Sequence, residues 1–128
     1  MAAKPRGIAP FFLVRDVEQA AEYYRDKLGF EIGPYFGSPP VFVIVQRDRM
    51  AIQLGRMSGG RGGSNRDWRE EAIDAYIWVR SADRRYAELR RNGAALIDSP
   101  SLKPYGMKEF DVRDADGYVL RFGEDVPG

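Results

Sequence analysis

The chain has 128 residues, 44% of them hydrophobic, which suffices for the core of one compact domain or of two small modules. Lysine and arginine total 20 against 19 acidic residues, so nucleic acid is not an expected partner. The absence of cysteine and histidine excludes disulfides, thiolate metal ligands, a cysteine nucleophile and imidazole chemistry. No apolar run reaches membrane-spanning length and no signal-peptide core begins the chain, so we expect a cytoplasmic protein without membrane partners.

The first part of the chain predicts a strand that leads directly into a capped helix. Residues 8–14 are mostly apolar, with branched and aromatic side chains typical of a partly buried strand. Asp16 is a good N-cap, apolar residues then recur at helical spacing over 17–28, and Gly29 can adopt the left-handed conformation that ends a helix. Three further strands are predicted, over residues 30–36, 41–46 and 50–55. The strand over 41–46 is almost wholly apolar, so we expect cover on both of its faces.

Residues 57–67 are rich in glycine and predict a flexible joint. Glycines in such a stretch can form a phosphate-binding loop, but that loop opens directly onto a helix. Here the next regular segment is predicted to be a strand that begins near Ala72. A flexible joint is therefore favoured over a phosphate-binding loop.

After the joint, the first pattern returns. A strand is predicted over 75–79, Ser81 is a good N-cap, and a helix then runs to Asn92 and Gly93. Three strands follow, over residues 94–102, 107–113 and 118–123. Val79 lies 65 positions after Val14, and Gly93 lies 64 positions after Gly29. The sequence thus predicts an α+β fold in which one strand, helix and three-strand unit is used twice, although any two strand-to-helix joins share part of this pattern.

A unit with one helix covers only one face of its sheet, so the second face must meet the other unit or enclose a cavity. Alternation along the predicted strands assigns ten residues to that second face: Ala9, Phe11, Leu13, Gln53, Asp74, Tyr76, Trp78, Glu109, Val119 and Arg121. Aromatic side chains with a few polar groups are typical of a small-molecule pocket. Two alternatives remain open: the aromatic residues are core, and Glu109 with Arg121 is a cross-strand ion pair.

The doubled pattern, the segment 14–30 and the segment 105–123 together resemble the vicinal oxygen chelate superfamily, which includes glyoxalase I, extradiol dioxygenases and bleomycin resistance proteins. The segment 105–110 is most similar to the bleomycin-resistance branch. The resemblance implies one domain over 1–128 made of two βαβββ modules, each with a curled mixed sheet around a cleft, commonly assembled as a homodimer. The modules would span about 7–56 and 72–125 with a linker over about 57–71. They would pair within one chain or between chains.

Metal-using members of that superfamily carry their ligands on the inner face of four strands. The resemblance places Ala9, Gln53, Asp74 and Arg121 at these positions. Alanine has no donor atom and arginine is a permanent cation, so these residues do not make a catalytic metal site. We therefore expect no metal and no other cofactor, which disfavours glyoxalase and dioxygenase activity.

Two functions remain. The first is a metal-free binding protein that sequesters an aromatic or apolar small molecule. Its site would contain Phe11, Leu13, Tyr76 and Trp78 as apolar contacts, with Gln53, Asp74, Glu109 and Arg121 to orient the ligand. Bleomycin itself is disfavoured, because a protein that captures a cationic antibiotic should carry marked negative charge. The alternative is a metal-independent lyase, isomerase or hydrolase with Asp74 or Glu109 as the base and Arg121 holding an anionic substrate. A third possibility is an interaction module with a vestigial cleft.

Overall fold

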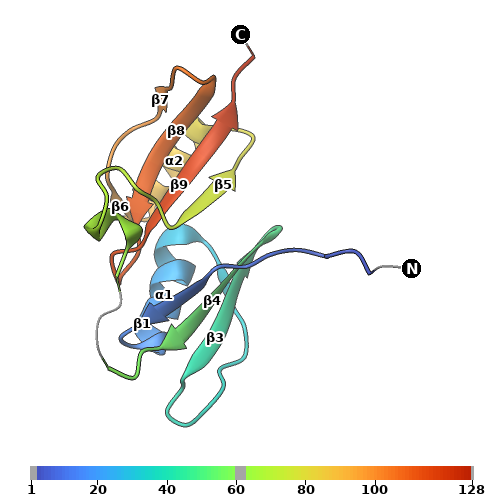
Figure 1. The fold of residues 1–128 in the computed structure, drawn as a ribbon, viewed down its shortest axis with the longest axis vertical. Helices are drawn as coiled ribbons and strands as arrows, with labels where there is room; N and C mark the ends of the chain where they lie inside the picture. Colours follow the sequence, from blue (N-terminus) through green and yellow to red (C-terminus); the bar gives the residue numbers. More distant parts are fainter. Residues whose placement is uncertain (1–2, 60–62, 128) are drawn as a thin grey trace.

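The computed structural model describes residues 3–59 and 63–127 (Figure 1). Residues 60–62, in the middle of the predicted joint, lie outside the described residues. The elements in chain order are β1 (Phe11–Val14), α1 (Val17–Leu28), β2 (Glu31–Ile32), β3 (Phe42–Arg47), β4 (Met50–Arg56), the 3-10 helix η1 (Asn65–Asp67), β5 (Ala75–Trp78), α2 (Ala82–Arg91), β6 (Ala95–Leu96), β7 (Ser101–Leu102), β8 (Met107–Arg113) and β9 (Val119–Asp125). The α+β class is confirmed.

The strands form two sheets of the same topology. The first has the order β1-β4-β3-β2, and the second has the order β5-β9-β8-β6, with β7 also paired to β8. In each sheet the opening strand runs parallel to the closing one, as β1 does to β4 and β5 to β9, and the other pairs are antiparallel. The repeat that the sequence predicts is thus present, because both sheets have the same strand order and the same strand directions.

The predicted helix ends are confirmed. Asp16 accepts a hydrogen bond from the Gln19 backbone N–H at 3.0 Å, and Gly29 has the left-handed φ of 77°. Ser81 accepts in the same way from the Arg84 backbone N–H at 3.1 Å. Each cap satisfies one of the N–H groups that a helix leaves without a partner in its first turn.

Several strands differ from the prediction. The first begins at Phe11 rather than residue 8, and residues 30–36 and 94–102 supply only two-residue strands. The predicted joint contains η1, and β5 begins at Ala75. Cover on both faces of β3 was predicted wrongly: Val43 is buried, whereas Ile44 remains partly exposed. The reason is that one helix covers one face of this sheet.

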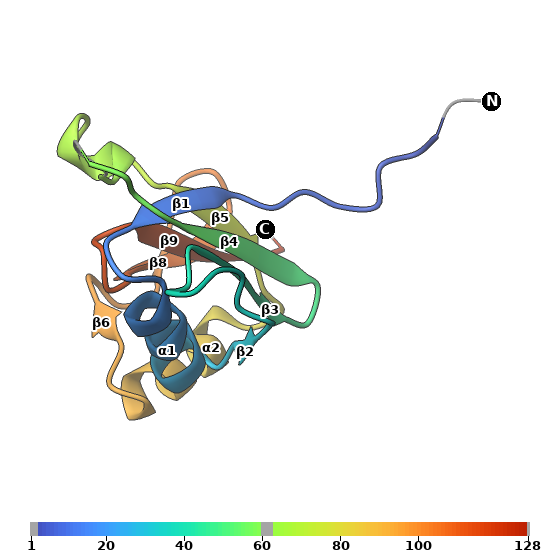
Figure 2. The same ribbon diagram turned by 90° about the horizontal axis from the view of Figure 1, so that it is seen from below.

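Both helices lie on one side of the molecule and both sheets on the other (Figure 2). The sheets are open rather than curled as the resemblance implied, because four or five short strands with free edges at β1 and β5 are too few to close. The buried core lies between helices and sheets and includes residues of both halves: Val14, Ala21, Tyr24, Leu28, Val43, Val45, Leu54, Leu89, Phe110, Val112, Leu120 and Phe122.

Helix α1 of the first half is fastened to the β8–β9 turn of the second. The Tyr24 hydroxyl donates to the Asp114 carboxylate at 2.7 Å, and Asp114 is only 6% exposed. The same carboxylate accepts from the backbone N–H groups of Asp116 and Tyr118, each at 2.9 Å. Because desolvation by burial outweighs these hydrogen bonds, the pKa of Asp114 is raised to about 6.

This contact gives the stability of the chain a defined pH dependence. A carboxyl with a raised folded-state pKa holds its proton longer in the folded chain than in the unfolded one, so its contribution to stability falls as pH rises from about 4 to about 6. Asp114→Asn removes the titration. We expect the free energy of unfolding of the parent chain, relative to that of the variant, to fall by about 1 kcal/mol between about pH 5 and pH 7. Urea unfolding at both pH values measures this, and a difference that does not change with pH would contradict it.

Candidate functional site

The open face of the second sheet carries a row of polar side chains. Cross-strand register places Tyr76 on β5 beside Arg121 on β9, and Arg121 beside Asp111 on β8. Glu109 is two residues before Asp111, so it points to the same face, while Phe110 and Val112 point into the core. The sequence predicted this alternation on β8 correctly.

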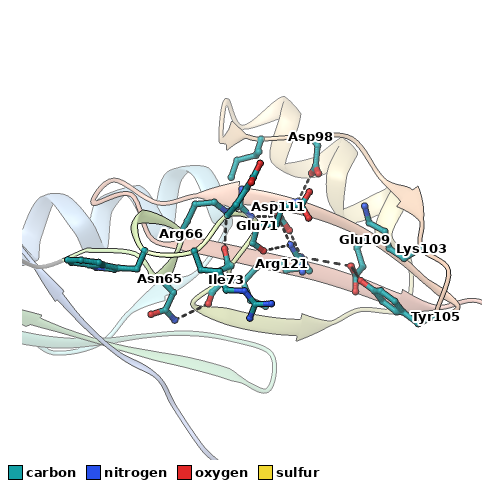
Figure 3. Close-up of a pocket in the computed structure, with 15 residues that line it drawn as sticks. Asn65, Arg66, Glu71, Ile73, Asp98, Lys103, Tyr105, Glu109, Asp111 and Arg121 are labelled. Atoms are coloured by element: carbon teal, nitrogen blue, oxygen red, sulfur yellow. Dashed lines mark hydrogen bonds and ion pairs between the residues drawn. The ribbon is translucent and has the colours of Figure 1, made fainter.

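A groove of about 900 Å³ lies over this face (Figure 3). The segment from Asn65 to Ile73 forms one wall, and the segment from Ile97 to Tyr105, which carries β7, contributes the other. Glu109, Asp111 and Arg121 form the floor. Further lining residues are Arg66, Trp68, Arg69, Glu70, Glu71, Ala72, Asp98 and Lys103.

Asp111 is the centre of the floor. Arg121 donates to both of its carboxylate oxygens, from Nε at 2.7 Å and from Nη2 at 3.0 Å. Arg66, in the wall from Asn65 to Ile73, donates from its Nη2 to Oδ2 of Asp111 at 2.7 Å. Burial by itself would raise the pKa of Asp111, but the hydrogen bonds from the two guanidinium groups outweigh it and lower the pKa. Asp111 therefore stays charged and joins the wall to the sheet.

Glu109 is the second acidic group of the floor and is 2% exposed. Its carboxylate accepts from the hydroxyls of Tyr76 and Tyr105, both at 2.6 Å, and lies 3.9 Å from Nε of Arg121. The predicted cross-strand ion pair of Glu109 with Arg121 is thus only a long contact, since Arg121 is turned toward Asp111. Burial and the neighbouring carboxylate raise the pKa of Tyr76, so its hydroxyl keeps its proton and acts as a donor.

The wall from Asn65 to Ile73 is held in place by backbone contacts. Arg66 Nε donates to the Ala72 carbonyl at 2.9 Å, and Arg121 Nη2 donates to the Glu71 carbonyl at 3.2 Å. Glu71 has a φ of 62°, a left-handed conformation that costs a non-glycine residue about 1–3 kcal/mol. The hydrogen bonds around Asp111 offset that cost and keep the wall over the sheet.

Asp74 has a place beneath this wall rather than in the groove. Its carboxylate accepts from the Ser64 hydroxyl at 2.6 Å and from the backbone N–H groups of Asn65 at 2.7 Å and Val119 at 2.8 Å. With three donors within the chain, Asp74 anchors the start of the wall to the sheet. Its predicted role as a ligand contact or base gains no support from this placement.

The other predicted site residues lie apart from the groove. Phe11, Leu13 and Gln53 are on the open face of the first sheet, where Phe11 covers Gly55 and stacks on Phe42 with ring centroids 6.0 Å apart. Trp78 is 71% exposed beside Tyr76, but it lines a different groove. Of the predicted set, the structure brings Glu109 and Arg121 together, with Tyr76 bonded to Glu109.

The two open faces correspond position by position but differ in chemistry. By register, Phe11 and Gln53 of the first sheet match Tyr76 and Arg121 of the second. Phe42 and Ile44 likewise match Glu109 and Asp111. The same scaffold thus presents an apolar face on the first sheet and a hydrogen-bonding face on the second.

Sequence reasoning missed Arg66, Trp68 and Tyr105. They lie in segments without strand or helix periodicity, so no pattern assigned them to a face. The spacing of Tyr105 and Glu109 offers no signal either, because Gly106 turns the chain between them with a φ of 87°. Only the folded chain brings these side chains to the walls of the groove.

Comparison with solved structures gives clear matches over nearly the whole chain. TioX from Micromonospora sp. ML1 is 15% identical with a TM-score of 0.75, and the match covers 95% of this chain and 100% of that one. A glyoxalase/bleomycin resistance protein/dioxygenase from Nocardioides is 14% identical with a TM-score of 0.71, covering 100% and 88%. A glyoxalase-related enzyme from Clostridium phytofermentans is 15% identical with a TM-score of 0.76, covering 97% and 98%. The chain has the vicinal oxygen chelate fold. The sequence itself matches no family model and no curated protein.

The metal site that the vicinal oxygen chelate fold implies does not fit the residues of this chain. Of the four positions, Ala9 offers no donor, Asp74 is engaged by three hydrogen bonds, and Arg121 is a cation bound to Asp111. Among the described residues, no group of three or more acidic side chains is arranged to hold a metal ion. In the same residues, no helix has the length and apolar character needed to cross a membrane.

The bonds to Glu109 can be tested by stability measurements. Tyr76→Phe leaves a buried carboxylate with one donor fewer, so we expect a loss of about 1–3 kcal/mol in the free energy of unfolding. In a Glu109→Gln background the same substitution should cost less, because a neutral amide is less costly to leave without a partner. Urea unfolding of the parent chain, the two single variants and the double variant measures the coupling. Equal costs of Tyr76→Phe in both backgrounds would contradict the hydrogen bond.

Proposed function

We propose that the chain binds a small organic molecule, without a metal, in the groove over the second sheet. The observation that carries this proposal is the polar floor of Glu109, Asp111 and Arg121 beneath a groove of about 900 Å³ whose walls include Trp68 and Tyr105. A volume of this order accommodates a drug-sized ligand. The shared fold with glyoxalase and bleomycin resistance proteins supports a small-molecule site of this general kind.

The charged groups of the floor already have hydrogen-bond partners within the chain. Asp111 accepts from Arg66 and Arg121, and the Glu109 carboxylate accepts from two tyrosine hydroxyls. A ligand is therefore recognised less by a strong ion pair than by stacking and hydrogen bonds at the rim. Trp68 and Tyr105 suit this role, because they line the groove and are 82% and 64% exposed.

The alternative function, an enzyme with a carboxylate base, has weaker support. A base must be free to accept a proton from the substrate. Asp74 and Glu109 already accept two or three hydrogen bonds each from groups of the chain. Arg121 is likewise committed to Asp111, so an anionic substrate would compete with that carboxylate.

A second copy of the chain completes this proposal. The first sheet exposes Phe11 and Leu13 on its open face, and Phe36 nearby is 70% exposed. Both open faces lie on the same side of the molecule (Figure 2). A homodimer can therefore place the apolar face of one copy over the polar groove of the other, which buries the aromatic residues and encloses the ligand.

Ligand binding can be tested with the two tryptophans of the chain, of which only Trp68 lines this groove. Planar aromatic compounds are screened by thermal shift, and the affinity of each hit is measured by calorimetry. We expect Trp68→Ala to weaken hits by about tenfold through the loss of a stacking surface, and Trp78→Ala to change their affinity little. Hits that bind Trp68→Ala as tightly as the parent chain, or a screen without hits, would count against binding in this groove.

The dimer is tested separately by light scattering over a range of protein concentrations. We expect a dimer for the parent chain and a monomer for Phe11→Glu, because the variant replaces an apolar contact of the interface with a charge that loses its hydration on association. Ala87→Glu adds the same charge to an exposed position of α2, on the opposite side of the molecule, and should leave the dimer intact. A monomeric parent chain would overturn the assembly but not the groove.

A further inference from the structure

A second groove, of about 710 Å³, lies where the β3–β4 hairpin meets the β5–α2 corner. It does not share a lining residue with the first groove. Its walls carry four arginines, Arg49, Arg80, Arg84 and Arg85, together with the apolar side chains of Met50, Ile77, Trp78 and Val79. These arginines come from both halves of the chain.

The acidic residues of this groove do not balance the arginines. Glu88 is engaged by Arg47, whose Nη2 donates to Oε1 at 2.8 Å. Asp48 is the other acidic lining residue, and its carboxylate is 3.9 Å from Nη2 of Arg85. Asp48 also lies 3.8 Å from Nε of Arg47, so four arginines line this groove against two carboxylates that Arg47 already contacts. In a chain with a net charge of +1, this is a marked local concentration of positive charge.

Arg85 lies near both acidic residues of the groove, but at longer than hydrogen-bond distance: its Nε is 3.7 Å from Oε1 of Glu88 and its Nη2 is 3.9 Å from Oδ2 of Asp48. Its side chain is 15% exposed and lies over the Phe122 ring at 5.6 Å. Its Nη1 atom is buried and has no hydrogen-bond partner among the described residues. Burial, followed by the nearby charge of Arg47, lowers the pKa of Arg85. The long ion pairs with Asp48 and Glu88 compensate the Arg85 charge only in part, and an anion in the groove would add to that compensation.

We propose that this groove binds a small phosphate-bearing molecule with an aromatic or heterocyclic group. Arginine presents its N–H donors in a planar fork that matches the oxygens of phosphate, and several arginines together match its charge. The exposed indole of Trp78 provides a flat surface beside them on which a ring stacks. This site shares no lining residue with the groove over the second sheet, so the proposal does not depend on the ligand proposed to bind there.

The experiment uses inorganic phosphate and phenyl phosphate as probes, titrated by calorimetry into the intact chain at constant ionic strength. We expect both to bind saturably, with phenyl phosphate about fivefold tighter because of Trp78. Arg80→Gln with Arg84→Gln should weaken both probes by at least about tenfold, since two charge-assisted contacts are lost. Both residues are exposed, so the variant is expected to fold.

The matched control is Arg90→Gln with Arg91→Gln, which removes the same charge from the other end of α2 and should leave binding unchanged. Trp78→Ala should abolish the preference for phenyl phosphate, whereas Trp68→Ala should preserve it. The proposal is overturned if neither probe saturates, or if both double variants lose affinity equally, which would indicate a response to net charge alone.

Discussion

Each sheet of this chain has a single helix to cover it, and both the groove of the proposed function and the proposed dimer surface follow from the face that the helix leaves open. Both helices lie on the same side, so both open faces point the same way. On the first sheet that face is apolar, and exposed side chains such as Phe11 and Leu13 remain without cover. On the second sheet it is polar, and the wall from Asn65 to Ile73 turns it into a groove.

The duplicated topology shows how one scaffold supports two kinds of surface. Equivalent positions carry Phe42 or Glu109, and Ile44 or Asp111, without a change in strand register. The core faces of the same strands stay apolar in both sheets. Because alternate residues of a strand face opposite sides, the open face can change its chemistry while the packing against the helix is retained.

The polar groups of the groove also stabilise it. Asp111 links the wall to the floor through Arg66 and Arg121, while Glu109 binds two tyrosine hydroxyls. Such groups are costly to bury unless their hydrogen bonds are complete, and here they are completed inside the chain. The groove is thereby preorganised, and a ligand need not supply the missing partners.

The sequence by itself determined the elements that depend on local rules. Caps at Asp16 and Ser81, the helix end at Gly29 and the alternation along β8 follow from neighbouring residues, and the structure has them all. Tertiary structure decided the rest, because it depends on contacts between distant segments. It turned Arg121 from Glu109 toward Asp111, gave Asp74 a structural role beneath the wall, and brought Arg66 across 45 residues to Asp111. The alternation along a strand predicts the face on which a side chain lies. Its hydrogen-bond partners on that face depend on how the distant segments pack when the whole chain folds.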